Sequence, residues 1–222
     1  MKVTLQAVTP NAEENIVEIA RVSSSRKDKK SKPEGLLNYL IKHKHFSPFE
    51  HSYLTLEIET SKAIGIQLIR HRSFTFQEFS QRYQDVNAID DMFEPVELRK
   101  QCDNNRQSST EVFNPIIRME NTPWFASESP ADEIVVSLLG KIQSVYNRLL
   151  EAGVAREQAR MILPMTTKTK IFMTGSIRSW IHFFDLRDDE HAQKEIQLIA
   201  KEGKKIFSEQ FPIISRALSY SK

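Results

Sequence analysis

One run of the chain, RHRSFTFQEFSQRY between Arg70 and Tyr83, gathers side chains that could bind a charged small molecule. Its polar residues form a cationic start and an alternating tail: Arg70, His71, Arg72, Glu78, Ser80 and Arg82. Side chains two positions apart lie on one face of a strand, so an extended tail would align a carboxylate, a hydroxyl and a guanidinium. Guanidinium groups suit phosphate, and the other two hydrogen-bond the polar edge of a heterocycle. The pattern therefore predicts a site for an anionic, ring-bearing molecule, with a nucleotide as the best fit.

The same charges could instead form a solvated, ion-paired surface, which is a common arrangement of arginine beside glutamate. The aromatic residues of the run favour the binding site, because three phenylalanines and a tyrosine lie among the charges. Aromatic side chains tend to be buried, and burial would draw the charges into a partly desolvated place where they need partners.

The elements before this run must bring its groups together. Residues 54–58 alternate between apolar and polar, which predicts a half-buried strand, and Ser61 is placed to cap the helix that follows. On that helix Gln67, Arg70 and His71 fall at i, i+3 and i+4 and share one face. We therefore expect a helix end to deliver the first cations beside a strand that carries the tail of the run.

Other parts of the chain alternate between strand and helix patterns. Strands are expected near residues 3–7 and 167–172, and helices are expected to begin near Asn11, Pro33, Asp132, Ser176 and His191. A further helix is expected around AREQARMILP, which ends at Pro164. Between residues 84 and 130 four prolines and a polar stretch predict irregular structure with at most short helices. Because a long connection is either functional or disordered, we interpret it as a segment that covers the site.

Composition narrows the class of protein. The chain has 222 residues, a formal net charge of +2 and one cysteine, Cys102. The charge is too small to indicate nucleic acid by itself, and the lone cysteine excludes an internal disulfide and fits a reducing compartment. No apolar run approaches the length of a membrane span, so we expect a cytoplasmic protein without a membrane partner.

Three histidines and a glutamate lie close together in HKHFSPFEH: His43, His45, Glu50 and His51. They raise the alternative of a metal-dependent nucleotide hydrolase. However, their spacing matches no common zinc pattern and no H-E-x-x-H motif is present, so we expect no metal. A second alternative is an RNA- or phosphate-binding module, which would explain the basic and aromatic run and predicts affinity that falls steeply with salt.

The run from Arg70 closely resembles the signature of the flavin-dependent thymidylate synthases, the ThyX family, in which R-H-R-x-x-S precedes N-E-x-S-x-R-Y. Thr75 replaces the usual serine and Gln77 the common asparagine, and both keep the hydrogen-bonding class. HKHFSPFEH resembles the family's H-x-T/S-P-F-E-H segment, and SIRSWIHFFDLR resembles x-x-R-S-x-x-H/N-F-x-x-L-R. The resemblance runs from about Arg21 to Ile196 and is weakest across residues 84–130.

The resemblance implies two sets of site residues. Those expected to bind the flavin are Ser23, His45, Ser47, Glu50, Arg70, His71, Arg72, Glu78, Ser176, Ile177, Arg178 and His182. Those expected to bind the nucleotide are Gln67, Arg70, Glu78, Phe79, Ser80, Gln81, Arg82, Arg160 and Arg187. Ser176 stands where some relatives have asparagine. No G-x-G-x-x-G cluster is present, which agrees with a flavin held by arginine, histidine and hydroxyl groups.

The implied reaction is the methylation of dUMP to dTMP, with 5,10-methylenetetrahydrofolate as one-carbon donor and NADPH-reduced FAD as hydride source. Cys102 has no neighbouring histidine that would activate it, so the uracil ring must be activated electrostatically. We expect Arg187 to be the catalytic cation. Ser80 could be a nucleophile, but no histidine is placed to deprotonate it, so we assign it to binding.

The resemblance also implies the architecture. We expect an α+β fold in which a small, mainly antiparallel sheet packs with several long helices in a single domain over residues 1–222. It further implies a homotetramer with active sites shared between subunits, and no nucleic-acid partner.

Overall fold

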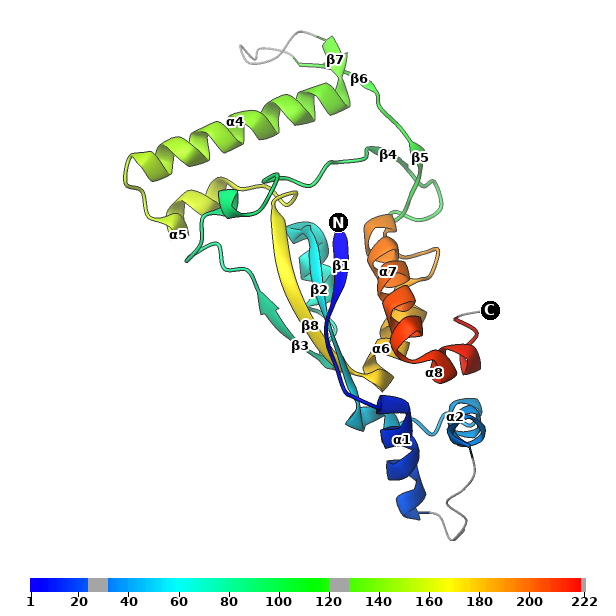
Figure 1. Cartoon of the computed structure of the whole chain (residues 1–222). Coiled ribbons are helices and arrows are strands. Elements are labelled where there is room, and N and C mark those ends of the chain that lie inside the picture. The colour runs from blue at the N-terminus through cyan, green and yellow to red at the C-terminus, as the bar shows by residue number, and fades with distance from the viewer. Residues whose placement is uncertain (24–31, 120–127, 221–222) are drawn as a thin grey trace. The chain divides into compact units, whose positions relative to one another are not determined.

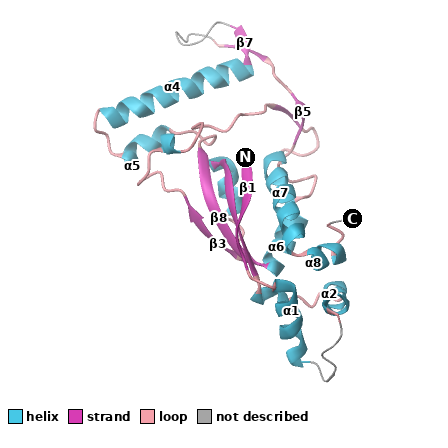
Figure 2. Ribbon diagram, viewed as in Figure 1, coloured by secondary structure: helices cyan, strands magenta, loops and turns pink. Residues whose placement is uncertain are grey.

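The described residues of the computed structural model, 1–23, 32–119 and 128–220, form helices, one four-stranded sheet and two two-stranded sheets (Figures 1 and 2). The expected α+β fold with small antiparallel sheets is confirmed. The residues group into two compact units. Unit 1 contains residues 1–59, 66–78 and 170–222, and unit 2 contains residues 60–65 and 79–169. The expectation of a single domain stays a prediction.

The four-stranded sheet has the order β1-β2-β8-β3, and most of its residues belong to unit 1. Its strands are β1 (Lys2–Val8), β2 (Tyr53–Ser61), β3 (Phe74–Glu78) and β8 (Lys168–Ser176). β1 pairs antiparallel with β2, and β3 pairs antiparallel with β8, with Phe74 opposite Gly175 and Glu78 opposite Ile171. Burial alternates along β2 and β8 because side chains of a strand point to opposite faces. The alternating patterns in the sequence therefore predicted β1, β2 and β8, but not the position of β3 or the order of the strands.

Aromatic side chains form a large part of the core of unit 1. Trp180, Phe183 and Phe184 lie on α6 (Ile177–Arg187), and Phe207 lies on α7 (Lys194–Gln210); all four are fully buried. The Trp180 indole Nε1 donates a hydrogen bond to the Leu54 carbonyl on β2 at 2.9 Å. This bond satisfies the polar atom of a buried ring and attaches α6 to the sheet.

Three further helices complete unit 1: α1 (Ala12–Ala20), α2 (Pro33–Lys42) and α8 (Pro212–Ala217). Asn11 precedes α1 as expected, but its backbone is left-handed and its side chain makes no cap hydrogen bond. Glu13 lies in the first turn of α1, but its side chain points toward α8. It is buried, and its Oε1 accepts a hydrogen bond from the Ile214 backbone N–H of α8 at 2.7 Å. A carboxylate from α1 thus satisfies a free donor of the last helix.

The longest helix of unit 2 is α4 (Ala131–Glu151). Its Tyr146 is fully buried with Val86, Met92 and Ala159 in a small core. Val136 and Val145 remain 70% and 50% exposed, so the helix buries only part of its apolar surface within the described residues. The chain leaves α4 through Gly153, whose φ of 84° is the left-handed conformation that glycine adopts easily. None of the described helices is long and apolar enough to span a membrane.

The segment from 84 to 130 contains strands that the sequence did not predict. β4 (Arg99–Gln101) pairs with β5 (Ser109–Val112), and β6 (Ile116–Arg118) pairs with β7 (Glu128–Pro130). All residues of β5 and β6 are exposed, so their sequences lack the alternation that burial of one face imposes. Within the described residues of this segment the one helix is a short 3₁₀ turn, as expected, but the short strands were not expected. Residues 120–127 of this segment lie outside the described residues.

The remaining short helices are α3 (Lys62–Leu68), α5 (Arg156–Ala159) and the 3₁₀ turns η1 (Arg21–Ser23), η2 (Ser47–His51), η3 (Val86–Ala88) and η4 (Arg160–Ile162). The helix expected around AREQARMILP is split into α5 and η4, and it ends before Pro164 because proline cannot continue the hydrogen-bond pattern.

Candidate active site

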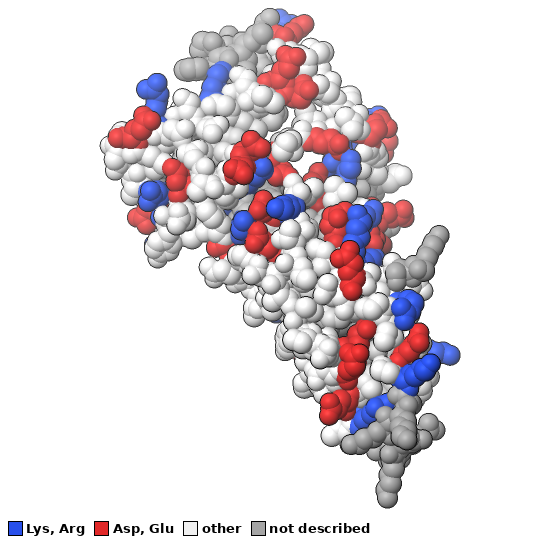
Figure 3. Space-filling view, in the orientation of Figure 1, with Lys and Arg blue, Asp and Glu red and all other residues white. Residues whose placement is uncertain are grey.

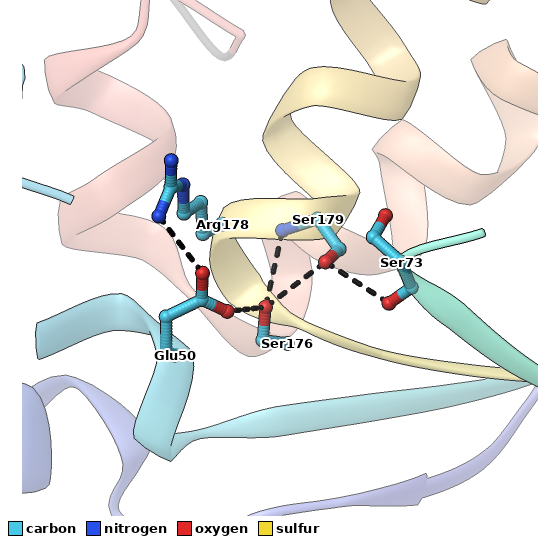
Figure 4. Close-up of polar contacts among 5 residues, drawn as sticks. All are labelled: Glu50, Ser73, Ser176, Arg178 and Ser179. Atoms are coloured by element: carbon cyan, nitrogen blue, oxygen red, sulfur yellow. Dashed lines mark hydrogen bonds and ion pairs between the residues drawn. The ribbon is translucent and has the colours of Figure 1, made fainter. Parts of the chain in front are cut away.

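A network of hydroxyl, carboxylate and guanidinium groups surrounds the first turn of α6 in unit 1 (Figure 4). Ser176 caps the helix, and its Oγ accepts a hydrogen bond from the Ser179 backbone N–H at 3.2 Å. The same hydroxyl donates to Glu50 Oε2 at 2.6 Å, and Arg178 Nη1 lies 3.0 Å from Glu50 Oε1. Ser179 Oγ in turn donates to the Ser73 carbonyl at 3.3 Å. Glu50 on η2 is therefore fixed against α6 through both of its oxygens.

A cavity of about 520 Å³ opens beside this network. Its lining residues all belong to unit 1: Phe46, Glu50, Ser73, Arg178, Ser179, Ile181, His182 and Asp185. The volume lies in the range of small-molecule sites, and the wall combines apolar surface with a few polar groups. Arg178 is 54% exposed at its side chain despite the ion pair with Glu50, so its guanidinium is accessible to an anionic ligand. The donor set suits a ring system with an anionic group.

A second cavity of about 390 Å³ in unit 1 lies where α1, η1, α2 and η2 meet. Ser23, His45 and Ser47 line it together with His51 and apolar residues. The rings of His43 and His45 lie 6.0 Å apart, and Tyr39 lies 4.3 Å from His43. These histidines therefore pack as aromatic rings. Among residues 1–23, 32–119 and 128–220, no three His, Cys, Asp or Glu side chains are grouped to hold a metal ion.

The last residue of α6, Arg187, contacts His71 of the run from Arg70 to Tyr83, called the signature run below. Arg187 Nε donates a hydrogen bond to His71 Nε2 at 2.9 Å, and both side chains are partly buried. Burial, followed by electrostatic repulsion from Arg187 and His182, lowers the pKa of His71 to about 4. Burial and Arg70 also lower the pKa of Arg187, but a guanidinium stays protonated at neutral pH. The pair therefore consists of a cation and a neutral acceptor.

In unit 2, two guanidinium groups meet at Glu157. Arg82 Nη2 lies 3.7 Å from Glu157 Oε2, and Arg160 Nε donates to the Glu157 backbone carbonyl at 3.4 Å. Gln81, the residue before Arg82, is buried, and its Nε2 has no hydrogen-bond partner among the described residues. A buried N–H group without a hydrogen-bond acceptor destabilises the fold, so a bound ligand that supplies an acceptor to this amide would remove that cost.

Comparison with known proteins identifies the family. The family model described as "Thymidylate synthase complementing protein" matches residues 4–213. A probable flavin-dependent thymidylate synthase of Paramecium bursaria Chlorella virus 1 is 41% identical over 210 residues, which cover 94% of this chain and 91% of the relative. The flavin-dependent thymidylate synthase of Synechocystis sp. is 39% identical over 201 residues, 90% of this chain and 86% of the relative. This chain belongs to that family. The resemblance found in the sequence is thereby confirmed.

In this member of the thymidylate synthase complementing family, the signature run differs in shape from the sequence-based expectation. α3 ends at Leu68, so Arg70 and His71 do not share a helix face with Gln67. They lie in the turn that follows, where the His71 backbone N–H donates to the Leu68 carbonyl at 3.0 Å. The Gln67 side chain donates to Gln193 Oε1 at 2.6 Å instead.

The tail of the run is also not a single strand. β3 ends at Glu78, and the Ser80 carbonyl accepts hydrogen bonds from the Tyr83 and Gln84 backbone N–H groups at 3.1 and 3.0 Å. The expected common face of Glu78, Ser80 and Arg82 on an extended backbone was therefore wrong, because a turn replaces the strand. Glu78 belongs to unit 1, whereas Phe79, Ser80, Gln81 and Arg82 belong to unit 2.

The structure of this family member brings some expected flavin residues together and not others. Glu50, Ser176, Arg178 and His182 gather around the first cavity, although the Ser176 hydroxyl is already hydrogen-bonded to Glu50 and Ser179. Ile177 has a fully buried side chain, and its N–H donates to the Ser52 carbonyl, so neither its side chain nor its N–H is available to a ligand. Arg72 is exposed.

Sequence reasoning did not assign several residues of these sites, among them Ser73, Ser179, Asp185 and Glu157. For Ser179 a signal was present, because the third residue after a capping serine donates its backbone N–H to that serine. Asp185 also follows from spacing, because it lies at i+7 from Arg178 on the same helix. Ser73 and Glu157 contribute through the backbone or contact residues far away in the chain, which spacing alone does not reveal.

Proposed function

We propose that this chain catalyses the reductive methylation of dUMP to dTMP as a flavin-dependent thymidylate synthase, a methyltransferase. Its relatives carry that name, and one structural observation supports the assignment most directly. Arg187, the expected catalytic cation, lies in a partly desolvated position and hydrogen-bonds a neutral imidazole. A cation in such surroundings interacts more strongly with a developing negative charge than one in water.

The cofactor of the proposed reaction is FAD, with NADPH and 5,10-methylenetetrahydrofolate as co-substrates. The groups around the two cavities of unit 1 fit such a ligand, since they combine a guanidinium, imidazoles, hydroxyls and apolar walls. Arg178, His182, His45 and Ser47 would hold it. When bound, FAD supplies the hydride that completes the methyl group.

The chain's own residues bind and polarise the nucleotide in this proposal. Arg82 and Arg160 suit its phosphate, because two guanidinium groups already converge on Glu157. Gln81 Nε2 would find its partner on the base or sugar. Arg187 favours the electron-rich form of the uracil ring by its charge. Cys102 plays no part.

We also propose that the protein is a homotetramer whose sites draw residues from several subunits, and that it acts in the cytoplasm. The exposed Val136 and Val145 on α4 are consistent with burial against another subunit. Residues 84–119 and 128–130 would belong to a segment that covers the site. Limited proteolysis with and without dUMP tests this; equal cleavage in both would contradict a covering role.

The other candidate functions have less support. A metal-dependent hydrolase requires a ligand cluster, and the described residues contain none. An RNA-binding module requires a basic surface, whereas acidic and basic side chains are interspersed on the face shown in Figure 3. Metal analysis of the purified protein and the salt dependence of RNA binding test these two alternatives.

The deciding experiment uses the purified full chain. We expect visible flavin absorbance after reconstitution with FAD, and formation of dTMP from dUMP, methylenetetrahydrofolate and NADPH, measured by chromatography. Omission of any one component should abolish the product. A flavin-saturated protein that forms no dTMP with all components present would refute the proposal.

A further inference from the structure

We propose that His71 is a positioning residue that orients the guanidinium of Arg187 through the hydrogen bond from Arg187 Nε to His71 Nε2. The inference rests on the proposed function, in which Arg187 is the catalytic cation. It differs from the flavin-binding role that the family resemblance implies for His71.

The hydrogen bond defines the state of both groups. Because Nε2 accepts at 2.9 Å from a guanidinium that has no acceptor atom, it must carry a lone pair, and the imidazole proton lies on Nδ1. Within the described chain, this is the hydrogen bond that the Arg187 side chain makes. It uses Nε and leaves the two terminal NH₂ groups, which can donate in parallel to two acceptors of a ligand.

The imidazole is itself held in place. Its ring lies 5.0 Å from Phe183 at an interplanar angle of 72°, and 6.3 Å from Phe74 at 89°. Both phenylalanines are buried, and Phe183 precedes Arg187 by one helical turn on the same face of α6. Edge-to-face contacts fix the plane of the ring, so the direction of the Nε2 lone pair is fixed as well.

A neutral acceptor has an advantage over a carboxylate at this position. A carboxylate would also orient the guanidinium, but its negative charge would oppose the attraction between Arg187 and an electron-rich ring. His71 stays neutral because burial, Arg187 and His182 hold its pKa near 4. The imidazole can therefore orient the cation without cancelling its charge.

Two substitutions at His71 distinguish the effect of its hydrogen-bond acceptor on kcat from the effect of its ring shape. His71→Phe keeps a ring against Phe74 and Phe183 but removes the acceptor, and His71→Gln supplies an amide oxygen near the position of Nε2. With FAD saturating, we expect kcat for dTMP formation to fall about 10- to 100-fold in His71→Phe, with a smaller change in the KM for dUMP. His71→Gln should recover most of kcat.

A double-substitution cycle tests whether His71 acts through Arg187. In the Arg187→Ala background, His71→Phe should change kcat by less than about twofold, because the group that it positions is gone. Bound FAD per chain is measured for every variant. An additive effect, a His71→Gln variant as slow as His71→Phe, or a loss of activity that follows loss of FAD would each overturn the proposal.

A readout without substrate or cofactor separates this proposal from the proposed function. In ¹⁵N NMR of the full chain, with His71→Phe identifying the resonance, we expect the Nδ1–H tautomer. In Arg187→Ala the pKa of His71 should rise from about 4 toward 6.5, because a neighbouring cation is removed. The Nε2–H tautomer, or an unchanged pKa, would contradict the pairing. A wild-type protein that makes no dTMP yet shows the expected tautomer would refute the enzyme assignment and leave the pairing intact.

Discussion

The two ends of α6 hold their arginines in different ways. At the first turn, Arg178 forms an ion pair with the carboxylate of Glu50 at 3.0 Å, and both side chains are about half exposed. At the last residue, Arg187 is partly buried and hydrogen-bonds the neutral His71 at 2.9 Å. One arginine has a partner that balances its charge, and the other has a partner that does not.

This difference indicates how an arginine can be suited to binding or to catalysis. A carboxylate partner fixes a guanidinium and lowers its net electrostatic effect, which is acceptable where the side chain only holds a ligand. A neutral partner fixes the group and preserves its full charge, which matters where negative charge develops during a reaction. The predictions below test this distinction, from the largest expected effect to the smallest.

Arg187→Ala should have the largest effect. Loss of a preorganised cation should raise the activation free energy on the order of 2–4 kcal/mol, measured as kcat/KM for dUMP. Arg216→Ala is the matched control, because Arg216 forms an exposed ion pair with Glu34 at 3.4 Å in the same unit. Near-normal turnover in Arg187→Ala would remove the catalytic role from this end of the helix.

His71→Glu should reveal the value of a neutral partner. Glutamate and glutamine have the same shape, and both offer an oxygen to Arg187, but only glutamate carries a charge. We expect kcat to be about tenfold lower in His71→Glu than in His71→Gln, because the carboxylate offsets the charge of Arg187. Equal kcat values in the two variants would show that charge balance is irrelevant there.

Ser176→Ala should affect stability at the other end of α6. The substitution removes the helix cap and the hydrogen bond to Glu50, so we expect a loss of about 1 kcal/mol in the free energy of unfolding. Urea denaturation followed by circular dichroism measures it. Ser208→Ala is the control, because Ser208 is partly exposed within α7 and its hydroxyl does not cap a helix. Ser176→Asn should retain most of the stability, because asparagine also caps helices.

Glu50→Gln should have the smallest effect. It keeps the shape and an acceptor for the Ser176 hydroxyl but removes the charge that pairs with Arg178. Since half-exposed ion pairs contribute about 0.2–1 kcal/mol, we expect the Kd for FAD to change by no more than about fivefold. At saturating FAD, kcat should stay within about twofold. A large fall in kcat would mean that the two ends of α6 do not differ as described.

Both ends of α6 could be predicted from the sequence, but the contact that Arg187 makes at its C-terminal end could not. Ser176 as a cap and Arg187 as the last residue follow from local rules, since a serine precedes an amphipathic pattern of helical length. The alternating strands β1 and β2 follow from the same kind of rule. By contrast, the contact between His71 and Arg187 joins residues 116 positions apart, and nothing in either segment specifies the other.

The signature run shows a second limit of sequence patterns. Alternation of Glu78, Ser80 and Arg82 suggested a strand, but side-chain type does not reveal where a strand loses its partner. β3 is paired with β8 only as far as Glu78 opposite Ile171, and the backbone then turns at Ser80. Motif recognition singled out these residues as candidates, whereas their conformation depended on pairing with a distant segment.

The hydrogen bond between Glu13 and the Ile214 backbone joins the first and last helices of the chain. Burial raises the pKa of this carboxyl group, so Glu13 depends on its contact with α8 for a partner. Removal of the residues from Pro212 onward would leave an acidic group facing the interior of the protein near its N-terminus. Any shortened version made for crystallisation or fusion should therefore retain both helices.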